Sequence, residues 1–262
     1  MIRRLRATTF VKRLSTGRNQ PCVMLCEDDD GGQETVVVKL RAAFDAKETA
    51  LVCELMGSML ADDLDLPVPQ PVIVDIEAGF ERAMPLETLV GQVRDSIGPN
   101  FGTVFLGEGT MNWPTGRMIP QAMRPLAAEV FGFDVIVQNP DRRRNKPNLL
   151  VRGDDLFIFD HELAFSFVMG LIGGPPAPWK GQGLEFCRQH VFYDALKGSS
   201  ASWDRLTGAL EAVSDRRLQE YVKALPAEWK AKSSAPEQIV EYLKQARQHR
   251  DEIAAVITRL LT

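Results

Sequence analysis

Several features that define other protein classes are missing or scarce in this chain of 262 residues. The four cysteines (Cys22, Cys26, Cys53 and Cys187) include no second close pair, so their spacing does not fit a metal-binding framework, and we interpret them as core thiols in a reducing compartment. No apolar run approaches the ~20 residues of a membrane span. The basic N-terminus also lacks the apolar segment of a signal peptide. These absences predict a cytoplasmic protein without a membrane partner.

Excess positive charge is also absent. The formal net charge is −4, and charged residues make up 25% of the chain, as in ordinary globular proteins. A net negative chain has no electrostatic basis for non-specific attraction to phosphate backbones, so we expect no direct nucleic-acid binding. The basic residues are nevertheless concentrated in places, and one group, Arg142 to Arg144 with Lys146, lies within the most informative stretch of the sequence.

That stretch covers residues 138–165 and reads Q-N-P-D-R-R-R-N-K-P-N-L-L-V-R-G-D-D-L-F-I-F-D-H-E-L-A-F. Two short apolar runs, 149–151 and 156–159, flank a Gly-Asp-Asp turn signal and predict a β-hairpin. Asn148 comes just before the hairpin and Asp160 just after it, so the two side chains should lie together. A carboxylate and an amide oxygen suit Mg²⁺, and Asp141 would stand nearby, free to face a hydroxyl.

The wording N-P-D-R-R-R-N-K-P-N-L-L followed by F-D-H-E-L-A-F resembles the HipA-like kinase family and, more distantly, the phosphatidylinositol 3- and 4-kinases. Each piece alone could be an ordinary turn or helix cap. Together they imply an α+β, two-lobed protein-kinase-like fold. We expect a small antiparallel β N-lobe over residues 1–107, with one helix, and a mainly helical C-lobe over residues 108–262 that carries the catalytic loop and metal site.

The first 107 residues fit the N-lobe layout. Strand-like runs flank a polar loop containing Gly17, and a β-branched strand ends near Lys39. In the resemblance, the loop covers the phosphates of ATP, Lys39 reaches them, and Glu54 rather than Glu48 pairs with Lys39. Phe105 and Leu106 would lie at the hinge that meets adenine. Two alternatives stay open: Lys39 could end its strand in solvent, and Glu54 could face water.

The resemblance also implies roles in the second lobe. Asp141 would accept a hydrogen bond from the acceptor hydroxyl and take its proton, and its arginine neighbours should keep it ionised. Arg142 or Arg143 would steady the γ-phosphate. Asn148 and Asp160 would bind Mg²⁺. Asn145, four residues after Asp141, is a rival to Asn148, which we favour because it directly precedes the apolar strand.

We therefore expect an ATP- and Mg²⁺-dependent kinase that phosphorylates Ser or Thr on a protein, with the chain itself as one candidate acceptor. The family suggests a toxin-antitoxin system and an antitoxin partner. The sequence departs from the kinase pattern in four ways: its N-lobe loop has only Gly17, Arg143 stands where the family has His, Asn148 comes seven residues after Asp141 where the family Asn comes five after, and no A-P-E motif follows Asp160. We also expect the chain to lack the extra N-terminal region of full-length HipA toxins.

These departures leave two alternatives. One is a phosphotransferase that acts on a small-molecule hydroxyl, which the missing A-P-E motif favours. The other is a catalytically silent, kinase-like module that holds nucleotide. Turnover of ATP without an added protein substrate would separate these two alternatives.

Overall fold

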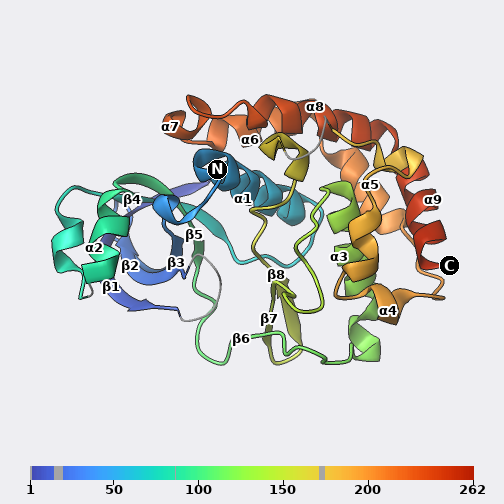
Figure 1. The fold of residues 1–262 in the computed structure, drawn as a ribbon, viewed down its shortest axis with the longest axis horizontal. Coiled ribbons are helices and arrows are strands. Elements are labelled where there is room, and N and C mark those ends of the chain that lie inside the picture. The colour runs from blue at the N-terminus through green and yellow to red at the C-terminus, as the bar shows by residue number, and fades with distance from the viewer. Residues whose placement is uncertain (1, 15–19, 86, 171–174) are drawn as a thin grey trace.

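The computed structural model describes residues 2–14, 20–85, 87–170 and 175–262. The N-terminal part contains five strands that form a closed barrel in the order β1-β2-β3-β5-β4 (Figure 1). Their bounds are Arg3–Arg13 for β1, Cys22–Glu27 for β2, Gln33–Lys39 for β3, Pro71–Ile76 for β4 and Gly98–Val104 for β5. Closure leaves no open sheet edge in this part of the chain.

The expected small antiparallel sheet is wrong in one respect, because the barrel is mixed. Four neighbouring pairs are antiparallel, but β1 runs parallel to β4, with Arg3 opposite Val72 and Arg6 opposite Asp75. The chain between β3 and β4 passes through a long helix, and this crossover brings β4 back in the direction of β1. Pairing across such a distance leaves no signal in the local alternation of apolar residues.

Side chains fill the barrel tightly. A Cβ atom on Gly102 of β5 would lie 2.7 Å from a methyl group of Val36 and 2.9 Å from one of Val74. Glycine is therefore required where strands β3, β4 and β5 meet. Outside the barrel, the short helices η1 (Arg41–Ala43), η2 (Phe80–Ala83) and α2 (Glu87–Arg94) connect the strands.

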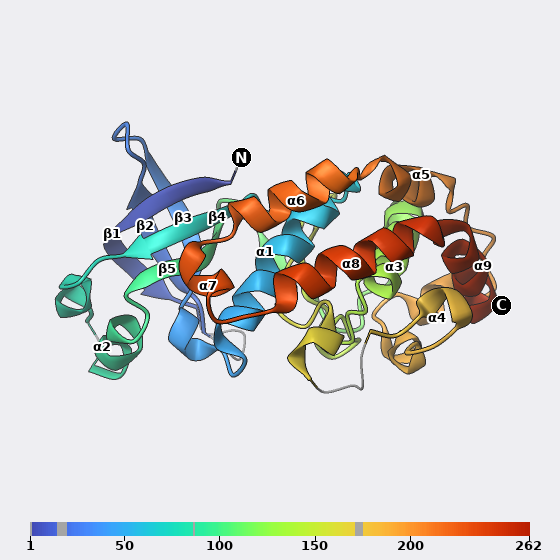
Figure 2. The ribbon, with the colours of Figure 1, turned by 90° about the horizontal axis from the view of Figure 1, so that it is seen from above.

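Helix α1 (Lys47–Asp63) joins the barrel to the helical part (Figure 2). The sequence predicts a helix over residues 45–64 from its apolar spacing, and this prediction is confirmed. Thirteen of its residues are buried, among them Glu48 and Glu54. A helix that is buried on nearly all sides must pair its charged groups inside the protein, because an unpaired buried carboxylate is costly.

The predicted hairpin is also present. Strand β7 (Leu149–Arg152) pairs with β8 (Asp155–Ile158), and the short β6 (Met111–Asn112) adds a third strand. Gly153 takes a φ of +60° in the turn, a conformation that glycine adopts at little cost. The predicted division after residue 107 falls between β5 and β6, and the division itself stays a prediction.

Helix α3 (Arg124–Ile136) leads into the hairpin, and further helices complete the C-terminal part. These are η3 (Gln121–Met123), η4 (Ser166–Met169), η5 (Pro178–Lys180), η6 (Glu185–Gln189), α4 (Tyr193–Leu196), α5 (Asp204–Ala212), α6 (Asp215–Ala224), α7 (Ala227–Lys230), α8 (Ala235–Gln248) and α9 (Arg250–Leu261). Apolar stripes at helical spacing predict two to four amphipathic helices over roughly residues 183–262, whereas the structure has six there, α4 to α9, two of them only one turn long. None of the described helices has the length and apolar character needed to cross a membrane.

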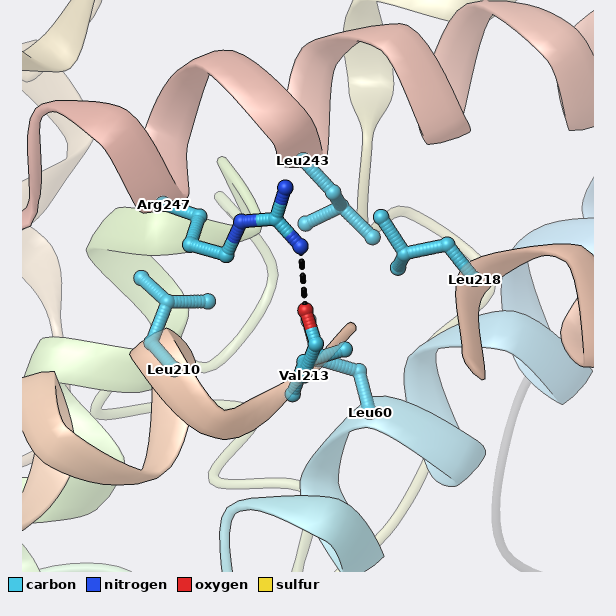
Figure 3. A pocket seen from close by; sticks show the side chains of 6 residues that line it. All are labelled: Leu60, Leu210, Val213, Leu218, Leu243 and Arg247. Atoms are coloured by element: carbon cyan, nitrogen blue, oxygen red, sulfur yellow. Dashed lines mark hydrogen bonds between the residues drawn. The ribbon is translucent and has the colours of Figure 1, made fainter. Parts of the chain in front are cut away.

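A small apolar gap lies among these helices (Figure 3), lined by Leu60, Leu210, Val213, Leu218, Leu243 and Arg247. Arg247 lays its stem over the leucines, and its guanidinium donates a hydrogen bond of 2.5 Å to the carbonyl oxygen of Val213. The gap has no room for a water molecule. It is a packing feature of the helical core rather than a ligand site.

Candidate active site

A partly buried lysine, Lys39, connects the barrel, helix α1 and the end of the hairpin. Lys39 ends β3, and its ammonium forms an ion pair with Oε1 of Glu54 on α1. The same ammonium lies 2.5 Å from Oδ1 of Asp160. The predicted pairing with Glu54 is present, and both open alternatives for these residues are wrong. Glu48 instead contacts Arg41 and Lys232.

Asp160 follows β8 in a strained backbone conformation. Its φ is +63°, and Gln138, Asn148 and Phe165 also have φ between +50° and +55°. Left-handed conformations are costly for residues other than glycine, and they persist where the surrounding structure enforces them, often at functional sites. Burial favours a higher pKa for Asp160, but the charges of Lys39 and Lys146 outweigh it and hold the pKa of that carboxyl below its ordinary value.

Asp141 lies in the loop between α3 and the hairpin, and three side chains contact its carboxylate. Nζ of Lys146 lies 2.5 Å from Oδ2, and the guanidinium of Arg143 lies 3.1 Å from Oδ1. The amide of Asn148 donates to Oδ2 at 3.1 Å. The structure therefore places Asn148 against Asp141, which the sequence expected nearby, whereas Asn145 is exposed in the turn. The predicted pairing of the Asn148 and Asp160 side chains stays a prediction; the two ends of the hairpin meet through the backbone N–H of Phe159, which donates to the carbonyl oxygen of Asn148 at 3.2 Å. This placement favours Asn148 over its rival.

Lys146 is a residue that the sequence reasoning named only as part of the basic group in the loop, without a role of its own. Its ammonium contacts Asp141 and also lies 3.2 Å from Oδ2 of Asp160, so it bridges the loop and the end of the hairpin. Burial lowers the pKa of Lys146, but the charges of Asp160 and Asp141 prevail and raise it. The sequence carried a signal, because Lys146 lies between the two predicted site residues Asp141 and Asn148. Its contacts, however, depend on how the loop folds.

Arg142 does not reach the open part of the site. Its side chain is completely buried, and it donates to Oδ2 of Asp134 at 2.6 Å and to the carbonyl oxygens of Asn148 at 2.5 Å and Phe159 at 3.2 Å. The expectation that Arg142 steadies a phosphate therefore does not fit its placement. The expectation then passes to the adjacent Arg143, whose side chain pairs with Asp141 and is 41% exposed.

Asp134 on α3 is the centre of a buried polar network that shapes the catalytic loop. It binds Arg142, accepts from the amide of Asn139 at 2.9 Å and accepts from Nε2 of His190 at 2.9 Å. Burial favours a higher pKa for Asp134, but the charge of Arg142 and the hydrogen bonds from His190 and Arg142 together lower that pKa. Nδ1 of His190 accepts from the backbone N–H of Phe192 at 3.1 Å, so His190 is neutral with its proton on Nε2.

His161 anchors Asp160 against α1. Its backbone N–H donates to Oε2 of Glu54 at 3.0 Å, and its Nδ1 lies 3.3 Å from the hydroxyl of Ser58. A Cβ atom on Gly57 would lie only 2.8 Å from the Cβ of His161, so glycine permits this close approach. Burial, together with the charge of Arg142, lowers the pKa of His161 to about 3.

Three carboxylates could hold a cation here. The side chains of Glu54, Asp160 and Glu162 have oxygens within 4.8 Å of one another. Burial and the neighbouring charge of Asp160 raise the pKa of Glu162. The sequence reasoning did not single out Glu162, although two acids separated by one residue directly after a strand are a recognisable signal.

The remaining predicted residues are Phe105, Leu106 and Gly17. The N–H of Phe105 donates to the carbonyl oxygen of Thr35 at 2.9 Å, and the carbonyl oxygen of Leu106 accepts from Arg152 at 2.7 Å. These two residues follow β5 and lead from the barrel toward β6. Gly17 lies outside the described residues, so its predicted position over the phosphates stays a prediction.

The barrel, the long buried helix and the helical part beyond them form a kinase-like fold. The proinflammatory kinase CtkA of Helicobacter pylori has a similar structure, with a TM-score of 0.54 and 9% identity over 99% of this chain and 98% of that chain. The Rio2 kinase of Chaetomium thermophilum, solved with ADP, Mg²⁺ and phosphoaspartate, matches with a TM-score of 0.36 and 10% identity over 97% of this chain and 71% of that chain.

The family follows from the sequence. The profile of HipA-like kinases matches residues 7–256, and the chain belongs to this family. No curated protein matches the chain. The predicted resemblance is therefore confirmed at the level of the family and of the kinase-like fold.

Proposed function

We propose that this chain is an ATP- and Mg²⁺-dependent kinase that transfers the γ-phosphoryl group to a Ser or Thr hydroxyl of a protein. One observation carries the proposal: an unbroken row of ion pairs runs from Lys39 through Asp160 and Lys146 to Asp141. It joins the residue suited to orient phosphates, the residue suited to bind a cation and the residue suited to orient a hydroxyl. Family membership supports the same reaction class.

The donor set fits Mg²⁺. Asp160 and Glu162 offer carboxylate oxygens and Asn148 offers an amide oxygen, and hard oxygen ligands are those that this ion prefers. When bound, Mg²⁺ neutralises charge on the phosphates. Lys39 and Lys146 supply positive charge to the same carboxylates in the protein alone. We assign Asn148 and Asp160 as ligands, as the sequence predicted, and add Glu162.

The protein's own groups carry the remaining roles. Lys39, fixed by Glu54, orients the phosphates, and Asp141 accepts a hydrogen bond from the acceptor hydroxyl and later takes its proton. The transferring group must lie between that hydroxyl and Asp160. The ammonium of Lys146 contacts both Asp141 and Asp160, so it would lie beside the transferring group. A cation beside that group stabilises its developing negative charge. Arg142 holds the loop through Asp134, and Arg143, which pairs with Asp141 and is partly exposed, is the arginine left to approach the phosphate.

The acceptor is a protein Ser or Thr, and the chain itself is one candidate. An antitoxin partner and a role in a toxin-antitoxin system remain part of this proposal, as do the hinge contacts of Phe105 and Leu106 with adenine. Kinase family membership supports these assignments without naming the substrate.

The test uses the full chain with ³²P-labelled ATP and Mg²⁺, followed by mass spectrometry of the chain and of candidate acceptor proteins. Transfer to Ser or Thr that is lost in Asp160→Asn and kept in Asp154→Asn, a change in the hairpin turn, is the expected result. Transfer to small hydroxyl compounds alone would replace the protein acceptor with a small-molecule acceptor. Nucleotide binding without any transfer would indicate the silent module.

A further inference from the structure

The connection between α6 and α8, residues 225–234, reaches from the helical part to the barrel. It contains α7, which lies beside α1 in both views (Figures 1 and 2). No residue of this connection contacts Lys39, Asp141, Asn148 or Asp160 among the described contacts. Its contacts with the barrel and with α1 are nevertheless specific and polar.

Trp229 attaches this connection to the barrel. Its side chain is fully buried, and its indole N–H donates a hydrogen bond of 3.1 Å to the carbonyl oxygen of Pro99 in β5. Pro99 pairs with Asp75 of β4, so this bond reaches the part of the barrel where β4 and β5 meet. A buried indole N–H and a buried carbonyl oxygen each need a hydrogen-bond partner, and this one hydrogen bond satisfies both groups.

The next residues attach the same connection to the first turn of α1. Nζ of Lys232 lies 3.0 Å from Oε1 of Glu48, and the hydroxyl of Ser233 lies 2.9 Å from that of Thr49. Glu48 is only 7% exposed, so its charge depends on these partners. Burial favours a higher pKa for Glu48, but the hydrogen bond from Lys232 and the charge of Arg41 help to lower it.

Glu48 is linked through the chain to the two elements that carry the Lys39–Glu54 ion pair, the end of β3 and helix α1. Arg41, two residues after Lys39, brings its guanidinium to 3.5 Å from Oε1 of Glu48. Glu54 lies six residues further along the same buried helix. The backbone N–H of Arg41 also donates to Oδ1 of Asn100 in β5 at 2.8 Å. The contacts of Lys232 and Trp229 thus reach α1, β5 and the end of β3 together.

We propose that Trp229 and Lys232 are positioning residues that hold α1 against the barrel, so that Glu54 keeps Lys39 aimed at the phosphates of the nucleotide. This inference rests on the proposed function and adds a device by which the C-terminal helices control it. Neither residue touches the nucleotide. They act through Glu48 and Pro99, and a small shift of α1 would separate an ion pair that phosphoryl transfer requires.

The kinetic test compares Lys232→Met with Lys232→Arg and with Lys230→Met in the full chain. Lys230 lies in the same connection, and the described residues show no ion pair for it, so Lys230→Met is the matched control. We expect Lys232→Met to lower kcat/KM for ATP by about three- to fivefold, the size of one partly exposed ion pair. The melting temperature should fall by only a few degrees, since one ion pair is lost, and Lys232→Arg should restore both the rate and the melting temperature. Trp229→Phe, which keeps an aromatic ring but loses the N–H that binds Pro99, should also lower kcat/KM for ATP.

A double variant and hydrogen exchange test whether Lys232 acts by holding α1. If Lys232 acts through Glu48, the effects of Lys232→Met and Glu48→Gln on kcat/KM will not add in the double variant. Hydrogen exchange of residues 47–63 should be faster in Lys232→Met than in Lys230→Met, and this readout does not depend on activity. Identical exchange and kinetics in these two variants would overturn the inference. If the wild type neither binds ATP nor transfers phosphate, the proposed function fails, and the exchange comparison alone decides whether the connection holds α1.

Discussion

The ammonium of Lys39 lies 2.5 Å from Oδ1 of Asp160, although 121 residues separate them in the chain. This contact joins the end of β3 in the barrel to the end of the hairpin in the second part. Because Lys39 also binds Glu54, one cation balances two carboxylates in a site where all three side chains are largely buried. The repulsion between the Glu54 and Asp160 carboxylates therefore depends on whether Lys39 or another cation lies between them.

The first prediction concerns that balance. Lys39→Met leaves Glu54 and Asp160 close together without their shared cation, and losing one partner of a buried ion pair costs about 3 to 5 kcal/mol. We expect a lower melting temperature in calorimetry, and Mg²⁺ should raise it more in Lys39→Met than in the wild type because the ion replaces the lost charge. Lys180→Met, a surface change, is the control. Equal Mg²⁺ responses in the wild type and Lys39→Met would show that the ion does not replace the lost charge at these carboxylates.

The second prediction separates the two candidate amide ligands. Asn148→Ala should weaken Mg²⁺ binding in titration calorimetry with an ATP analogue, whereas Asn145→Ala should leave it unchanged. The physical reason is placement, because Asn148 is buried against Asp141 and Asn145 is exposed. Asp160→Asn should abolish Mg²⁺-dependent transfer. If Asn145→Ala weakened Mg²⁺ binding and Asn148→Ala left it unchanged, Asn145 would be the ligand.

The third prediction concerns the chemical step. Asp141→Asn should lower kcat by about 10²-fold or more, as expected for loss of a positioned base, with binding of an ATP analogue retained. Lys146→Met should also lower kcat, because its ammonium lies between Asp141 and Asp160. Single-turnover rates and analogue affinity measured side by side distinguish these effects from weakened binding. Undiminished transfer by Asp141→Asn would remove its catalytic role.

The fourth prediction is a loss of stability in mild acid. Burial, opposed by Asp134, lowers the pKa of His190, and burial lowers the pKa of His161 to about 3. Each histidine regains its ordinary pKa near 6.5 on unfolding, so below that value the unfolded chain binds more protons. Stability is therefore complete above about pH 6.5 and falls as the pH drops, by up to ~1.4 kcal/mol per pH unit for each histidine.

Urea unfolding between pH 7 and pH 5 measures this dependence. His190→Gln should give a shallower decline than the wild type, because it removes one of the two buried groups. His249→Gln is the control, since His249 is exposed and stacks on Trp179 at the surface of the helical part. A decline in His190→Gln as steep as that of the wild type would assign the acid sensitivity to other groups.

Local features of this protein could be read from its sequence. The apolar runs around Gly153 predicted the hairpin, and the apolar spacing of residues 45–64 predicted α1. Both depend on interactions within a short segment, where turn residues and side-chain periodicity decide the backbone. The order Asp141, Asn148 and Asp160 likewise carried the resemblance to the family that the sequence profile confirms.

Apart from the Lys39–Glu54 pair, which the family resemblance implied, the tertiary structure alone decided which charges meet. Nothing in the local sequence distinguished Arg142, which is buried on Asp134, from Arg143 beside it, or indicated that Lys146 bridges two aspartates. The parallel pairing of β1 with β4 was equally hidden. Such contacts join segments that are far apart in the chain or depend on how a loop folds against its surroundings. They are set by closure of the barrel and by the need of each buried charge for a partner, which no local pattern of residues records.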